Sequence, residues 1–220
     1  MRKTNSKAEV TLADRFTVEK VSSLVTHLEF LSQKDMCATM LRFEEHAESP
    51  EFKGKVFTLG QYREWYSRTT GAFTYYTDWE GFNVPSSSFR PFIEGLFDPL
   101  TKEEQEVVDL FKDRKDDFYV IATCRDVESA YEHEICHAMY RTIPEYGEEV
   151  RMLLAEFHLV PLCEYLLKIG YDSSVLDDEC NAYICDDALH LVGENVEFPY
   201  EAVKRFKDLK EKYKTNLEDY

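Results

Sequence analysis

The part of the chain after residue 127 constrains the fold most, because apolar residues recur there at helical spacing in one segment after another. Proline and glycine residues separate these segments: Pro144, Gly170, Gly193 and Pro199 stand where helices are expected to end or begin. We expect helices at about residues 127–142, 146–158, 161–169, 174–192 and 199–216. The C-terminal half is therefore predicted to be helical throughout.

The first half of the chain mixes the patterns of helices and strands. Two capping boxes, which begin at Thr58 and Thr101, predict helices that run to about residues 67 and 114. The stretch 118–123 is short, β-branched and aromatic, so it predicts a strand. Spacing and composition predict three further segments: a helix at 16–33, a strand at 38–43, and strands, turns and irregular loops in the aromatic, Gly- and Pro-rich stretch 71–98.

Length and element order together predict the fold class. With 220 residues, the chain is expected to form a single domain at residues 16–220 after a polar leader at residues 1–15. A mixed first half followed by helices predicts an α+β fold with a small mixed sheet and a helical C-terminal half.

The charge balance argues against two classes of partner. The chain has 43 acidic and 26 basic residues, a formal net charge of −17. Nucleic acids and anionic membranes bind clustered Lys and Arg, so neither is expected as a partner.

The expected compartment is the cytoplasm. No apolar run approaches the roughly 18–20 residues of a membrane span, and the polar start lacks the apolar core of a secretory signal. The six cysteines are scattered without a Cys-x-x-Cys pair, which indicates reduced thiols rather than a disulfide framework.

The segment predicted as a helix at 127–142 contains the motif His-Glu-x-x-His, formed by His133, Glu134 and His137. Histidines four residues apart project from the same face of a helix, so both imidazoles can bind one metal ion. Glu134 lies beside them, where a carboxylate can take a proton from a water molecule held by zinc. Two ordinary core histidines are the alternative, but a helix that follows a strand through a short loop favours the metal site.

Residues 117–187 resemble the catalytic core of the zincin metallopeptidases, in which a strand is followed by a helix with this motif. The resemblance implies a cleft, a Zn²⁺ ion and hydrolysis of peptide bonds in a peptide or protein substrate. It also implies that an extended peptide pairs with a strand near 118–124. The resemblance covers about a third of the chain and does not include the first 116 residues.

The third metal ligand follows from the branch of zincins that the chain resembles. The metzincin extension is missing, because Tyr140 and Ile143 stand where that pattern has Gly and His, and the aspzincin Gly-Thr-x-x-Asp segment is missing too. The gluzincins supply a Glu from a later helix, and here the candidate is Glu179, with the small Ala182 at i+3 for close helix contact. Tyr183, at i+4, is a candidate donor to the oxyanion, or else a half-buried core residue.

Other assignments remain open from the sequence. The rival third ligands are Glu148, Glu149, Asp178, Asp186 and His190. Glu132 and Arg141 flank the motif and are candidates for supporting contacts. Cys136, inside the motif, is expected to point into the core.

The sequence therefore predicts a zinc metallopeptidase with ligands His133, His137 and Glu179 and with Glu134 as the base. Three alternatives remain: a metal-dependent hydrolase of a non-peptide substrate, a proteolytic effector that acts in another cell, and an acidic binding or inhibitory protein with a vestigial motif.

Overall fold

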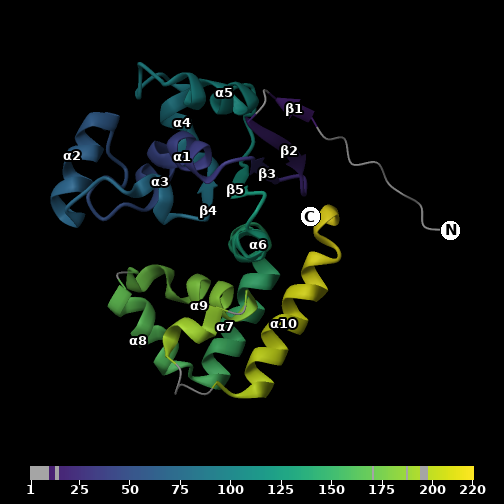
Figure 1. Cartoon of the computed structure of the whole chain (residues 1–220). Coiled ribbons are helices and arrows are strands. Elements are labelled where there is room, and N and C mark those ends of the chain that lie inside the picture. Colours follow the sequence, from purple (N-terminus) through teal and green to yellow (C-terminus); the bar gives the residue numbers. More distant parts are fainter. Residues whose placement is uncertain (1–9, 13–14, 170, 187, 194–197) are drawn as a thin grey trace. The chain divides into compact units, whose positions relative to one another are not determined.

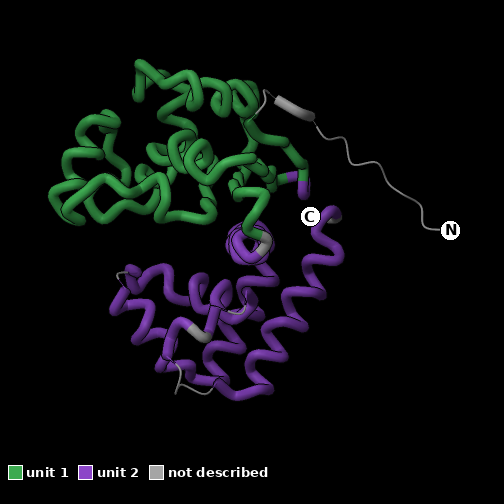
Figure 2. The backbone as a smooth tube through the Cα atoms, in the orientation of Figure 1, with its two compact units in different colours: residues 1–20, 24–127 green, residues 21–23, 128–220 purple. Residues whose placement is uncertain are grey.

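The computed structural model describes residues 10–12, 15–169, 171–186, 188–193 and 198–220. These residues form two compact units (Figure 2). Unit 1 comprises residues up to 127 without 21–23, and unit 2 comprises residues 21–23 and 128–220. The segment expected as the catalytic core, 117–187, spans the boundary between them. The predicted leader lies mostly outside the described residues.

Unit 1 is built on a five-stranded mixed sheet in the order β1-β2-β3-β5-β4 (Figure 1). The strands are β1 (Val10–Leu12), β2 (Phe16–Lys20), β3 (Val25–Phe30), β4 (Gly81–Pro85) and β5 (Tyr119–Cys124). β5 runs parallel to β3, and the other three pairings are antiparallel. All six residues of β5 are buried, as expected for an interior strand.

The helices among the described residues of unit 1 are α1 (Gln33–Glu48), α2 (Leu59–Thr70), α3 (Tyr75–Asp78), α4 (Ser86–Ile93) and α5 (Lys102–Phe111). α1 packs against β3, β4 and β5 and also contacts α3, α4 and α5. Phe43 of α1 is fully buried, with its ring centroid 4.6 Å from that of Phe89 and 4.1 Å from that of Phe92. Arg42, next to it, forms a buried ion pair with Glu104 of α5.

Unit 2 contains α6 (Glu128–Thr142), α7 (Pro144–Phe157), α8 (Val160–Ile169), α9 (Leu176–Cys185) and α10 (Tyr200–Lys214). Short 3₁₀ turns follow α8, α9 and α10, at Ser173–Val175, Ala188–Val192 and Leu217–Asp219. α6 packs against α7, α9 and α10. Glu132 of α6 pairs with Lys210 and Lys214 of α10, and Lys210 is buried.

The expected α+β class is confirmed, with the mixed sheet in the first half and helices after residue 127. Both capping boxes form as predicted at Thr58 and Thr101, and β5 coincides with the predicted strand. The helix predicted at 174–192 is shorter: α9 ends at Cys185 and a separate 3₁₀ turn follows.

Two predictions near the N-terminus are wrong. The helix expected at 16–33 is instead the pair of strands β2 and β3, in which Phe16 lies opposite Phe30. Here the side chains that enter the core are two residues apart within each strand, and the helical interpretation merged two strands across a turn. The strand expected at 38–43 lies within α1, whose core residues Met36, Cys37, Met40 and Leu41 recur at helical spacing.

The stretch 71–98 is only partly as predicted. It contains the strand β4 and turns, but also the helices α3 and α4, and α4 includes Pro91.

The expected pairing of a peptide with the strand at 118–124 is also wrong. β5 is hydrogen-bonded to β3 on one edge and to β4 on the other. A strand has only two edges, so no position remains beside β5 for a further strand.

The Phe43 packing gives a stability prediction. Phe43→Ala removes a fully buried ring from the aromatic contacts of α1 and α4, so it should lower the free energy of unfolding by about 3–5 kcal/mol. Val56→Ala, at an exposed position, is the control and should change it by less than about 0.5 kcal/mol. Urea unfolding followed by circular dichroism measures both, and equal small effects would contradict the packing described here.

Candidate metal centre

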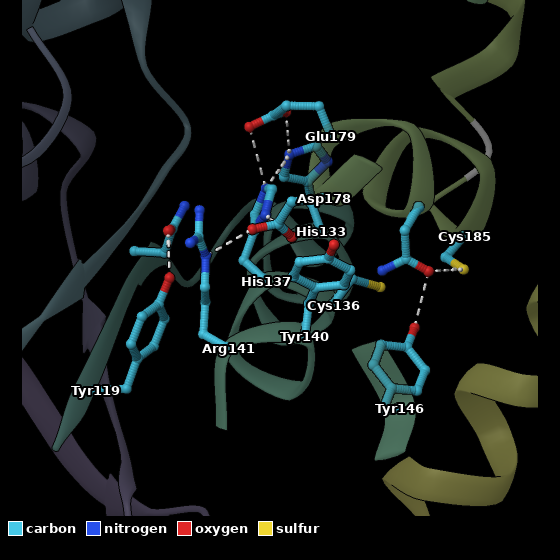
Figure 3. A network of polar contacts seen from close by, with 12 residues as sticks. Tyr119, His133, Cys136, His137, Tyr140, Arg141, Tyr146, Asp178, Glu179 and Cys185 are labelled. Carbon is cyan, nitrogen blue, oxygen red and sulfur yellow. Dashed lines mark hydrogen bonds and ion pairs between the residues drawn. The ribbon is translucent and has the colours of Figure 1, made fainter. Parts of the chain in front are cut away.

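The two histidines of the motif lie on the face of α6 that packs against α9. Their ring centroids are 4.8 Å apart, and the Nε2 atoms of His133 and His137 approach to 3.1 Å. Figure 3 shows that both rings point toward the carboxylate of Glu179. The i,i+4 spacing of the sequence therefore does bring the two imidazoles together, as expected for residues one turn apart.

Glu179 comes from the first turn of α9, and its side chain is buried. Its carboxylate oxygens lie 3.8 Å from Nε2 of His137 and 4.0 Å from Nε2 of His133. One ligand atom from each of the three residues can be chosen so that all lie within 4.8 Å of one another. Among the described residues, no other group of three or more His, Cys, Asp or Glu side chains meets this condition.

The outer nitrogen of each histidine contacts a carboxylate of α9 or its end. Nδ1 of His137 lies 2.8 Å from Asp178, and Nδ1 of His133 lies 2.6 Å from Asp186. Arg141 donates from Nε to the second oxygen of Asp178 at 2.9 Å. Carboxylates in these positions fix the tautomer and the ring orientation of metal-binding histidines.

With the Nδ1 atoms in these contacts, the two Nε2 atoms face each other and the carboxylate of Glu179. A neutral imidazole that donates from Nδ1 has a lone pair on Nε2, and two such lone pairs 3.1 Å apart repel each other. A cation between them removes the repulsion, whether it is a proton shared by the two rings or a metal ion. The arrangement is therefore suited to bind a cation.

The acidic surroundings also favour a proton on His137 when no metal is bound. Burial alone would lower its pKa, but the negative charges of Asp178 and Glu179 and the hydrogen bond to Asp178 raise the pKa well above 6.5. The charge of Glu134 contributes in the same direction.

The donor set fits zinc. Two imidazole nitrogens and one carboxylate are a common zinc set that leaves a fourth position open. At Zn–N distances of about 2.05 Å, tetrahedral ligands lie about 3.3 Å apart. The two nitrogens, 3.1 Å apart, are close to that value. The distances to Glu179 are longer: one carboxylate oxygen lies 3.8 Å from His137 and the other lies 4.0 Å from His133, so a shift of this side chain would complete the set.

Access to the group is uneven. The side chain of His133 is 18% exposed, whereas that of His137 is 3% exposed. Glu134 is also buried, so the carboxylate next to the two ligands is shielded from bulk water. Of the two histidines, His133 is therefore the more accessible to solvent.

Aromatic residues border the group. The ring of Tyr183 is buried and stands at 73° to that of His133, with centroids 5.5 Å apart. Burial raises the pKa of Tyr183, although a hydrogen bond from Tyr171 partly opposes this shift. Burial and the charge of Glu179 likewise raise the pKa of Tyr171. Both phenols are therefore neutral and able to donate a hydrogen bond.

The structure separates the rival ligands that the sequence left open. Asp178 and Asp186 lie at the outer nitrogens of the histidines, away from the inner face. Glu148 is exposed, and Glu149 binds Lys212 and Tyr213 of α10. The side chain of His190 lies outside the described residues.

The other residues near the motif also have definite places. Arg141 supports Asp178, as considered from the sequence, whereas Glu132 instead pairs with lysines of α10. Cys136 points into the core as expected, with no exposed surface.

Two features were missed by sequence reasoning. Tyr171 lies in the connection between α8 and α9, where no periodic pattern marks it. The pairings His133–Asp186 and His137–Asp178 show that α9 runs antiparallel to α6. The eight-residue separation of the two aspartates, with the small Ala182 midway, was the available signal, because these three positions share one face of a helix.

Comparison with protein-family models, with curated proteins and with solved structures gives no significant match for this chain. Across the part of the chain that the structure describes, no helix combines the length and apolar character needed to cross a membrane.

The Asp178 contact predicts a specific loss of zinc affinity. Asp178→Asn keeps the shape of the side chain but removes the charge that orients His137, so zinc affinity should fall roughly 10- to 100-fold. Competition with a chromophoric chelator measures this change. Asp177→Asn, at the exposed neighbouring position, should leave the affinity unchanged, and an equal loss in both variants would contradict the positioning role.

The raised pKa of His137 predicts that zinc binding releases a proton near neutral pH. At a pH above its usual value but below its raised one, the metal-free site keeps a proton on His137, and zinc must displace it. The apparent zinc affinity should thus rise with pH across this range and level off above the raised pKa. Calorimetric titrations in buffers of different ionisation enthalpy count the protons released. A pH-independent affinity would show that His137 is already neutral.

Proposed function

We propose that this protein is a zinc-dependent metallopeptidase, with His133, His137 and Glu179 as metal ligands. The observation that carries the proposal is the pair of inward-facing Nε2 atoms, 3.1 Å apart, opposite a buried carboxylate. Each histidine is held from behind by an aspartate, as metal-binding histidines generally are. If the two histidines were ordinary core residues that bind no metal, nothing would favour two Nε2 atoms that face each other with an aspartate at each Nδ1.

When bound, zinc would lower the pKa of water toward ~7 and polarise the carbonyl group to be cleaved. The residues of the chain then have separate tasks. Glu134, next in sequence to His133 and itself buried, accepts the proton of the attacking water and passes it to the leaving amine.

Tyr183 and Tyr171 are the residues that we propose to contact the substrate beside the ligands. Tyr183 packs against His133, the more accessible of the two histidines, and accepts a hydrogen bond from Tyr171. Because both phenols keep their protons, the Tyr183 hydroxyl can donate to the oxygen that becomes negative during the reaction. Zincin-like sites use such donors, and this is the role we propose for Tyr183.

The peptide substrate is the part of the proposal that rests on the resemblance to zincins. The donor set and the base would serve equally for other hydrolysable bonds, so a metal-dependent hydrolase of a non-peptide substrate is the alternative. The negative charge of the chain favours neutral or cationic substrates.

Glu134→Gln tests the mechanism. The change removes the base but leaves the three ligands, so zinc content should stay at about one ion per chain while turnover falls roughly 10²- to 10⁴-fold. A mixture of synthetic peptides of randomised sequence, with new amino termini quantified by mass spectrometry, serves as substrate. Glu148→Gln, at an exposed position on α7, is the matched control and should retain full activity.

The possible results separate the proposals. Undiminished cleavage by the Glu134→Gln variant would refute the role of the base. Zinc binding without cleavage of any peptide would favour a non-peptide substrate. A chain purified without a histidine tag that is stable and binds no zinc would favour an acidic binding protein.

Glu179→Ala tests the third ligand. Loss of the buried carboxylate leaves only two protein ligands, so zinc affinity should fall by at least about 100-fold, a loss of roughly 3 kcal/mol. Glu148→Ala should bind zinc as the unaltered chain does. If both variants keep full affinity, the metal is held elsewhere.

A further inference from the structure

Two cysteines of unit 2 lie in contact across neighbouring helices. Cys163 is on α8 and Cys180 is on α9, and their Sγ atoms are 3.6 Å apart. A disulfide has an S–S distance of about 2.05 Å, so the two sulfurs need to approach by only about 1.5 Å. Small rotations of two side chains can supply this movement.

The pair is open to a small oxidant. Cys163 is half-buried, whereas Cys180 is buried. Both line a cavity of about 440 Å³, together with Arg151, Leu154 and Leu167. Cys163 is therefore the thiol that a reagent from solvent meets first, with Cys180 directly behind it.

We propose that Cys163 and Cys180 are a site of reversible oxidation, modified by a low-molecular-weight disulfide such as oxidised glutathione. The Cys163 thiol gives its proton to solvent, and its sulfur attacks one sulfur of the reagent, which breaks the reagent's S–S bond and releases one thiol. Cys180 then loses its proton and attacks the sulfur of Cys163, which releases the second thiol. Two protein thiols are oxidised, and one disulfide is reduced to two thiols.

The new bond would act on the metal centre, and this part rests on the proposed function. The segment between the two cysteines contains Tyr171, Asp178 and Glu179. Joining its ends restricts this loop and ties α8 to the helix that supplies the third ligand. The oxidised form should therefore hold its ligands more rigidly and bind zinc more tightly.

A second cysteine pair provides an internal comparison. Cys136 and Cys185 also interact with each other, but both are buried, at 0% and 5% exposure. Cys185 borders a second cavity, but neither thiol of this pair is half-buried as Cys163 is. The pair should therefore be oxidised less readily under the same conditions.

The first experiment detects the modification itself. The metal-free full-length chain is equilibrated in glutathione buffers from reducing to oxidising, its remaining thiols are blocked, and its disulfides are mapped by mass spectrometry. We expect a bond between Cys163 and Cys180, reversed by dithiothreitol, with a rise in Tm of roughly 5–10 °C. Cys163→Ser should abolish both, and Cys124→Ser in unit 1 should abolish neither. Absence of the bond, or a bond between other cysteines, would overturn the proposal.

The second experiment tests the coupling. Zinc affinity is measured by chelator competition in the oxidised and the reduced chain, and the oxidised chain should bind several-fold more tightly. Cys163→Ser should show one affinity in both buffers. Equal affinities of the two forms would overturn the coupling. If the disulfide forms but neither form binds zinc, the metallopeptidase proposal fails while the oxidation site stands.

Discussion

The antiparallel packing of α6 against α9 is the contact on which the candidate centre depends. It places two carboxylates of α9 and its end behind the two imidazoles of α6, so that each ring is held by the opposite helix. Ala182, fully buried midway between the aspartates, allows the helices to approach closely. The orientation of both rings, and thus of both inner nitrogens, follows from this single interface.

The same interface explains which parts of the candidate site could be predicted from the sequence and which could not. The spacing of His133 and His137 is enough to put two imidazoles on one face, because that depends only on the helical repeat. The choice between Asp178 and Glu179 is different. Adjacent residues of a helix differ by about 100° in direction, and only the rotation of α9 against α6 decides which carboxylate reaches an outer nitrogen and which an inner one. The sequence pattern of one helix does not determine how that helix is rotated against its neighbour.

Fold prediction succeeded where the signal was local. The capping boxes and the buried strand β5 each depend on a few neighbouring residues, and the structure has them where the sequence placed them. It failed at 16–33, where the core positions of β2 and β3 together imitate a helix. Strand pairing joins residues that are distant in sequence, so neither the sheet order nor the enclosure of β5 by two neighbours could be deduced.

The ion pairs between α6 and α10 have a consequence for folding during synthesis of the chain. Glu132, one residue before the motif, pairs with Lys210 and Lys214 of α10, which lie about 80 residues further along the chain. During synthesis, α6 emerges long before those lysines exist. The helix that carries the motif therefore lacks these two ion pairs until synthesis has passed residue 214.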